Sequence, residues 1–137
     1  MAFLLDTNVV SELRKTAPHP HVLAWQQRQS HVDVYLSALV IGEVRQGIER
    51  LRSRDLKRAE ALDRWLSGLV SAYAERILPI TIDVAQQWGR LNVPPNPPPV
   101  VDGLMAATAL VHRLTLVTRN VADVARTGVA VVNPFEA

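Results

Sequence analysis

Four carboxylates stand where an α/β fold would bring them to one place. Each follows a strand-like apolar segment or lies in the first turns of a neighbouring helix: Asp6, Glu43, Asp102 and Asp123. Two carboxylates about 4 Å apart repel by about 4 kcal/mol at an effective dielectric constant of 20, so several at one sheet edge favour a cation between them. The ligands are all oxygen and the chain has no cysteine, which suits Mg²⁺ or Mn²⁺. Such ions can activate a water and stabilise the leaving oxygen of a phosphodiester.

Each acid also has a purely structural explanation. Asp6 is an ordinary N-cap for the helix that follows it. Glu43 and Asp102 could complement helix N-terminal dipoles, an effect worth about 0.3–1 kcal/mol each, and Asn120 with Asp123 has the spacing of a capping box. For any one of these acids, the structural explanation is about as likely as a role in a metal site. Apolar neighbours place Glu43 and Asp102 on inward-leaning faces, where an unpaired carboxylate is costly, so the four together favour the shared site.

The elements that must position these acids are strands alternating with helices. Strands are expected at 2–5, 34–37, 77–80, 114–118 and 129–133. Helices are expected at 7–14, 22–29, from 39 to about 51, around 62–70, at 84–91 and from 100 to about 113, with a turn that can include one helical turn near 121–123. This alternation predicts a parallel sheet with helices on both faces and right-handed crossovers. Ligands of such sheets bind at the carboxyl ends of the strands, and Asp6 directly follows the first strand.

The segments between these elements carry their own signals. Pro18 and Pro20 should break the first helix. The charged residues 50–58 suggest a solvated turn between two helices, and the prolines of residues 94–99 a stiff, extended surface loop. The small residues that follow position 100 allow the next helix to pack closely on the sheet.

Composition limits the class of protein. The 137 residues are expected to form a single domain over 1–137. Of 15 basic residues only Lys15 and Lys57 are lysines, so thirteen are arginines, which grip phosphate well, although a net charge of +2 is weak evidence for a nucleic-acid partner. No apolar run approaches a membrane span and no secretory signal is evident, so a soluble protein of a reducing, intracellular compartment is expected. The four histidines should lie at the surface and the three tryptophans in the core.

The chain resembles the PIN-domain ribonucleases, and among them the VapC-type toxins of bacterial toxin–antitoxin pairs, especially the FitB-like branch. The matching stretches are residues 4–12, residues 36–44 with Gly47, residues 102–109, and residues 114–120 with Asp123. They follow one another in order and cover essentially the whole chain. Asp-Thr-Asn alone is a weak signal, but four motifs at these separations are specific.

The resemblance implies a three-layer α/β/α PIN domain with a central parallel sheet of four to five strands. It also implies an Mg²⁺-dependent endoribonuclease, with Mn²⁺ as the other candidate ion. Carried over by position, Asp6, Glu43 and Asp102 are similar to the metal-binding acids, and Asp123 to the more variable fourth one. Thr7 and Asn8 match residues that orient Asp6, and Thr118 and Asn120 match polar residues on the rim of the site. Arg119 matches a position that either faces substrate phosphate or packs structurally.

The family further implies an RNA substrate, a cognate antitoxin, a homodimer or larger toxin–antitoxin assembly, and a cytoplasmic location. DNA would be contacted only through the antitoxin, and no membrane is involved. The proline loop departs from the family's usual glycine-rich or polar approach to Asp102.

Three other classes were weighed against this one. An aspartyl phosphatase needs a second aspartate where Asn8 stands, and a receiver-like module needs a lysine after a late strand, where neither lysine lies. A PIN fold that is catalytically weak and only binds or regulates partners remains open, because residues show ligands and not rates.

Overall fold

Five short parallel strands form one sheet in the order β3-β2-β1-β4-β5 in this computed structural model, which describes residues 1–136. The strands are β1 (Phe3–Leu5), β2 (Val34–Ser37), β3 (Ile77–Leu78), β4 (Thr115–Val117) and β5 (Val131–Val132). The central strand β1 is buried on both faces, as a parallel sheet between helical layers requires. Every residue of β1 is buried, and Leu36 of β2 and Leu116 of β4 beside it are 0 % and 1 % exposed.

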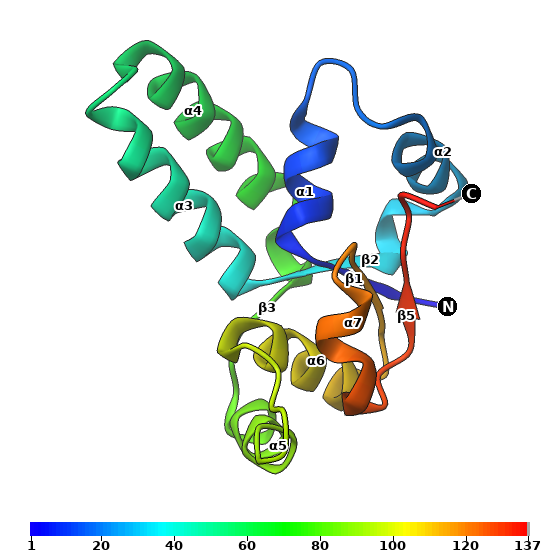
Figure 1. The fold of residues 1–137 in the computed structure, drawn as a ribbon. Coiled ribbons are helices and arrows are strands. Elements are labelled where there is room, and N and C mark those ends of the chain that lie inside the picture. Colours follow the sequence, from blue (N-terminus) through cyan, green and yellow to red (C-terminus); the bar gives the residue numbers. More distant parts are fainter. Residues whose placement is uncertain (137) are drawn as a thin grey trace.

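Helices cover both faces of this sheet. They are α1 (Thr7–Arg14), α2 (Pro20–Arg28), α3 (Ala38–Arg52), α4 (Leu56–Tyr73), α5 (Ile82–Leu91), α6 (Val100–His112) and α7 (Val121–Val124). Figure 1 shows α1 to α4 on one side of the strands and α5 to α7 on the other. The three-layer α/β/α fold and its parallel sheet are therefore confirmed. No helix within residues 1–136 is both long enough and apolar enough to cross a membrane.

The strand order reverses between β1 and β4. From β1 the chain steps outward through β2 to β3, and then returns across the sheet to β4 and β5 on the other side. In open α/β sheets the ligand crevice lies at such a reversal, outside the carboxyl ends of the strands. The register pairs Leu5 with Val117, so the residues after them, Asp6 and Thr118, emerge side by side at that place.

Several predicted boundaries were wrong. Pro20 does not only end the preceding segment but begins α2, where its fixed φ and missing N–H suit the first helical position. The charged residues 50–58 are not mainly a turn, since α3 runs to Arg52 and α4 begins at Leu56. The strands predicted at 77–80 and 129–133 shorten to two residues each, as befits the two sheet edges.

Packing follows the predicted patterns in the centre of the fold. α6 buries a run of small residues, from Ala106 to Ala109, together with Met105. Trp25 is 6 % exposed and meets the ring of Phe3 edge-on at 5.1 Å, whereas Trp65 and Trp88 are only partly buried. Three of the four histidines are exposed as expected, and His19 is partly buried.

Candidate active site

Asp6 is a buried carboxylate held by three donors. The residue is 6 % exposed and directly follows β1. Oδ1 accepts from the backbone N–H of Thr7 at 2.8 Å, while Oδ2 accepts from the hydroxyl of Thr118 at 2.7 Å and from Nδ2 of Asn8 at 3.2 Å. Asp6 is thus the N-cap of α1, so the capping explanation is right. The cap bond uses Oδ1 of Asp6 and holds the carboxylate in place where the strand order reverses.

Thr118, Asn8 and Asn120 form the polar support around Asp6. The Thr118 hydroxyl donates to Asp6 and accepts from Asn8 Nδ2 at 3.3 Å and from the backbone N–H of Asn120 at 2.9 Å. Oδ1 of Asn8 accepts from the backbone N–H of Arg119 at 3.2 Å. These contacts join the end of β1 to the end of β4. They bring together the supporting residues that were singled out in the sequence.

Glu43 lies one turn into α3, the helix that Ser37 caps through the backbone N–H of Leu39 at 3.1 Å. The Thr7 hydroxyl donates to Oε1 of Glu43 at 2.5 Å, which ties α3 to α1 beside Asp6. The prediction that Glu43 lies on an inward-leaning face was wrong, because the side chain is exposed. Val40 and Ile48 take the buried positions of α3 instead.

Asp102 occupies the first turn of α6 and is partly buried. Burial has the largest effect on its carboxyl and the negative charges of Asp6, Asp123 and Glu43 follow in that order; together they raise the pKa of Asp102 to about 6. The charges act on the same group, so the four acids predicted from separate segments lie within electrostatic range of one another. A position in the first helical turn partly offsets the cost of the charged form.

Asp123 lies in the single helical turn α7 and is exposed. The capping-box explanation for Asn120 and Asp123 was wrong, since Asn120 makes no side-chain cap and only its carbonyl accepts from the backbone N–H of Asp123, at 3.2 Å. The carboxylate of Asp123 is therefore not used in capping α7.

The donor set fits a hard divalent cation. All four side chains offer carboxylate oxygens, the ligands that Mg²⁺ and Mn²⁺ prefer. Within residues 1–136, no three His, Asp or Glu side chains are already gathered closely enough to bind one ion. Repulsion among carboxylates, visible in the raised pKa of Asp102, opposes their closer approach unless a cation neutralises them.

The structure adds two contacts that the sequence did not indicate. The guanidinium carbon of Arg119 lies 3.7 Å from the ring centroid of Phe135, so a residue near the C-terminal end of the chain holds this cation. Gly103, next to Asp102, packs against Asn92 so closely that an added Cβ would lie 2.3 Å from Asn92 Oδ1 and 3.2 Å from Trp88 Cδ1. No sequence motif marks Phe135 or Asn92, because each contacts a motif residue only through the folding of the chain.

Comparisons with known proteins agree with this fold. A family model described as PIN domain matches residues 3–128. VapC ribonuclease Y4jK of Sinorhizobium fredii is 34% identical over 138 residues, covering 97% of each chain. Toxin FitB of Neisseria gonorrhoeae is 35% identical over 136 residues, covering 96% of this chain and 97% of its own. A solved structure of FitAB bound to the IR36 DNA fragment superposes with a TM-score of 0.89 at 32% identity, covering 98% of this chain and 96% of that one.

Proposed function

This chain belongs to the PIN-domain family, and we propose that it is an Mg²⁺-dependent endoribonuclease that acts as the toxin of a type II toxin–antitoxin pair. The observation that supports this most is that the charges of Asp6, Glu43 and Asp123 all act on Asp102, with Asp6 placed at the strand-order reversal. The names of two relatives similar along nearly their whole length, a ribonuclease and a toxin, point the same way.

We assign the four acids as the residues that would hold Mg²⁺, or Mn²⁺ in its place. When bound, such an ion supplies Lewis-acid stabilisation of phosphodiester oxygens and a water that loses its proton near neutral pH. Asp6 is already immobilised by three hydrogen bonds. Thr7 orients Glu43 through its hydroxyl, and Asp102 must give up its proton to act as a ligand. Asp123, exposed on a single helical turn, is the least constrained of the four.

The remaining residues orient this set. Asn8 and Thr118 fix the carboxylate of Asp6, and the backbone of Asn120 fixes Thr118 in turn. Partners that orient metal ligands commonly change activity by 10–100-fold when removed. Arg119, held over Phe135, carries a positive charge on the same side of the fold, suited to substrate phosphate.

A cognate antitoxin is the proposed protein partner, and DNA would be contacted only through that antitoxin. The support is the solved complex of FitAB with DNA, whose matched chain covers nearly all of this one. We also propose a homodimer, its assembly into a larger toxin–antitoxin complex, an RNA substrate and a cytoplasmic location. The family resemblance supports these proposals, and the ribonuclease name of one relative supports the RNA substrate.

The test is cleavage of a mixed RNA pool by the purified protein in Mg²⁺, in Mn²⁺ and in EDTA. Asp6→Asn should abolish cleavage while circular dichroism shows an unchanged fold. Asp33→Asn is the matched control, because Asp33 precedes β2 and so lies at the opposite end of the sheet from the four acids. Metal-dependent cuts in the wild type and in Asp33→Asn, absent from Asp6→Asn, would support the proposal.

Two results would oppose it. Equal cleavage by wild type and Asp6→Asn would trace the activity to a contaminating nuclease. If the purified protein cleaves no RNA in any condition but binds its antitoxin in a separate assay, the second candidate is favoured. That candidate is a PIN fold that binds its partner without appreciable catalysis.

A further inference from the structure

The positive charge of the chain is concentrated at the tip of the hairpin formed by α3 and α4. Residues 49–58 hold five of the 15 Lys+Arg and two of the 13 Asp+Glu, so this short segment is more positive than the whole chain. Figure 1 shows the hairpin extending away from the sheet, with the turn between α3 and α4 at its outer end. The candidate site, by contrast, is a cluster of acids.

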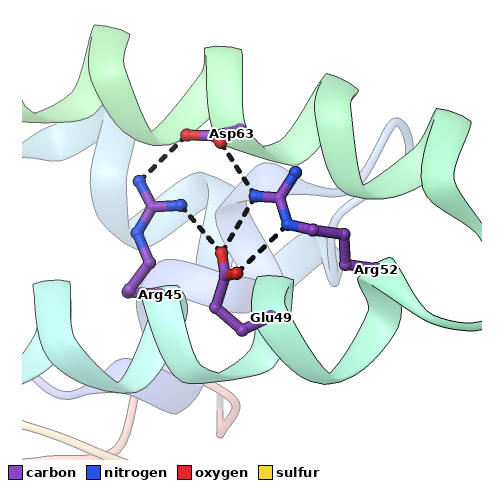
Figure 2. Close-up of polar contacts among 4 residues, drawn as sticks. All are labelled: Arg45, Glu49, Arg52 and Asp63. Carbon is purple, nitrogen blue, oxygen red and sulfur yellow. Dashed lines mark hydrogen bonds and ion pairs between the residues drawn. The ribbon is translucent and has the colours of Figure 1, made fainter.

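Two of the hairpin arginines are engaged in ion pairs. Arg45 contacts Asp63 at 2.9 Å and Glu49 at 3.3 Å, and Arg52 contacts Glu49 at 2.9 Å and Asp63 at 3.1 Å. Figure 2 shows the four side chains closing a ring between α3 and α4. A small apolar core of its own, Ile48 with Ala59 and Leu66, lies in the same hairpin. Together these contacts stiffen the hairpin and fix the position of its tip.

Within residues 49–58, four other basic residues remain exposed, and no ion pair within residues 1–136 involves them. They are Arg50, Arg54, Lys57 and Arg58, here called the basic tip. Helix stability explains only part of this set. A cation such as Arg50 in the last turn of α3 is favoured by the helix dipole, but Lys57 and Arg58 lie in the first turn of α4, where the dipole disfavours cations.

The basic tip stands at a fixed distance from the candidate site, because α3 carries both. Glu43 and Arg50 are seven residues apart in one helix, which places them on the same face and about 10 Å apart along the axis. Arg54, Lys57 and Arg58 lie beyond Arg50 at the hairpin turn. An RNA bound at the site must therefore extend along the hairpin by at least this distance to reach the basic residues.

We propose that the basic tip binds backbone phosphates of a folded RNA substrate at a distance from the bond that is cut. The inference rests on the proposed ribonuclease function. Four carboxylates at the site repel a polyanion, so cations outside this acid cluster add affinity for RNA through phosphate contacts and counterion release. Residues 49–58 contain no aromatic side chain, so the contact is to phosphates and does not stack bases.

The test measures RNA binding with proteins that all carry Asp6→Asn, so that the RNA stays intact. The tip variant is Lys57→Gln/Arg58→Gln, and the matched control is Arg28→Gln/Arg90→Gln, two exposed arginines on α2 and α5 with the same total charge change. The probe is a labelled stem–loop RNA several helical turns long, titrated at several salt concentrations in Mg²⁺ buffer. Circular dichroism checks that all variants fold.

We expect the tip variant to bind the stem–loop about tenfold more weakly than the control at physiological salt, with the slope of log K against log salt reduced by about 1.5, as loss of two phosphate contacts predicts. Equal affinities and slopes for tip and control variants would overturn the inference, as would failure of the parent protein to bind the RNA. The ribonuclease function is tested separately by metal-dependent cleavage, so tip-dependent binding without cleavage would overturn that function and not the role of the tip.

Discussion

The hydroxyl of Thr118 donates a 2.7 Å hydrogen bond to Oδ2 of Asp6 and so joins the carboxyl ends of β4 and β1. The two residues are 112 positions apart in the chain. Both are buried, with exposed fractions of 1 % for Thr118 and 6 % for Asp6. This bond lies where the strand order reverses, and it fixes the one candidate ligand that is withdrawn from solvent.

Replacing Thr118 by Val should weaken both the fold and the site. The near-isosteric change removes the donor to Asp6 and the acceptor for the N–H of Asn120. We expect a loss of about 1–2 kcal/mol in the free energy of unfolding and a 10–100-fold loss of RNA cleavage, measured by urea denaturation and initial rates. Thr108→Val is the control, because the buried Thr108 hydroxyl donates only to the carbonyl of Leu104. It should lose comparable stability and keep its activity, and equal activity in both variants would contradict a role for Thr118.

Asp102→Asn should inactivate the enzyme and stabilise its metal-free fold. The pKa of Asp102 is raised from 3.8 to about 6 in the folded protein, so folding is favoured by protonation. This contribution is complete below pH 4 and is lost as the pH rises through about 6. At pH 7.5 the ionised side chain therefore destabilises the fold, by about 1 kcal/mol once solvent screening of a partly exposed group is allowed for.

Thermal unfolding in EDTA measures this effect. The variant should be more stable than the wild type at pH 7.5 and nearly equal to it at pH 4.5. If the variant instead loses stability equally at both pH values, then Asp102 is stabilised rather than strained by its surroundings.

Gly103→Ala should disturb the approach of α6 to α5. An added Cβ would lie 2.3 Å from Asn92 Oδ1, an oxygen that is buried and has no hydrogen-bond partner within the described residues. We expect a loss of about 1–3 kcal/mol in unfolding free energy, accompanied by lower activity because the neighbouring Asp102 moves. Adding Asn92→Ala should recover most of the stability despite the loss of the bond from Asn92 Nδ2 to the carbonyl of Pro98. Additive losses in the double variant would show that the two residues do not clash.

Phe135 should contribute to stability through Arg119. The 3.7 Å approach of the guanidinium carbon to the ring centroid predicts a coupling free energy of about 0.5–1 kcal/mol. A double-mutant cycle with Arg119→Ala and Phe135→Leu, followed by urea denaturation, measures it directly. The same cycle on kcat/KM reports whether Phe135 positions Arg119 for substrate. Zero coupling free energy in both measurements would show that Arg119 and Phe135 lie side by side without contributing to stability or activity through their contact.

The convergence of the four acids could be predicted from the sequence because of the fold class. Carboxyl ends of parallel strands meet at one edge of a sheet, so Asp6 after β1 and Thr118 after β4 had to emerge as neighbours. The raised pKa of Asp102 agrees with that expectation. Local capping explanations did not compete with it, since Asp6 both caps α1 and lies in the cluster.

Other features depend on long-range packing that local pattern does not encode. The rotation of α3 about its axis, which leaves Glu43 exposed, is set by how Val40 and Ile48 fit the core. The contacts of Phe135 with Arg119 and of Asn92 with Gly103 join segments whose own sequences are unremarkable. The start of α2 at Pro20 was missed because proline can either end a helix or occupy the first position of the next one. Its fixed φ suits that first position.

The central place of β1 also governs when the site can form during synthesis. β1 is made first, yet one of its two neighbours, β4, follows more than a hundred residues later. A ribosome therefore carries a chain whose Asp6 lacks the hydroxyl of Thr118 for most of elongation, and whose central strand is flanked on one side only. The proposed site can therefore be complete only near the end of synthesis, once β4 has left the ribosome and paired with β1.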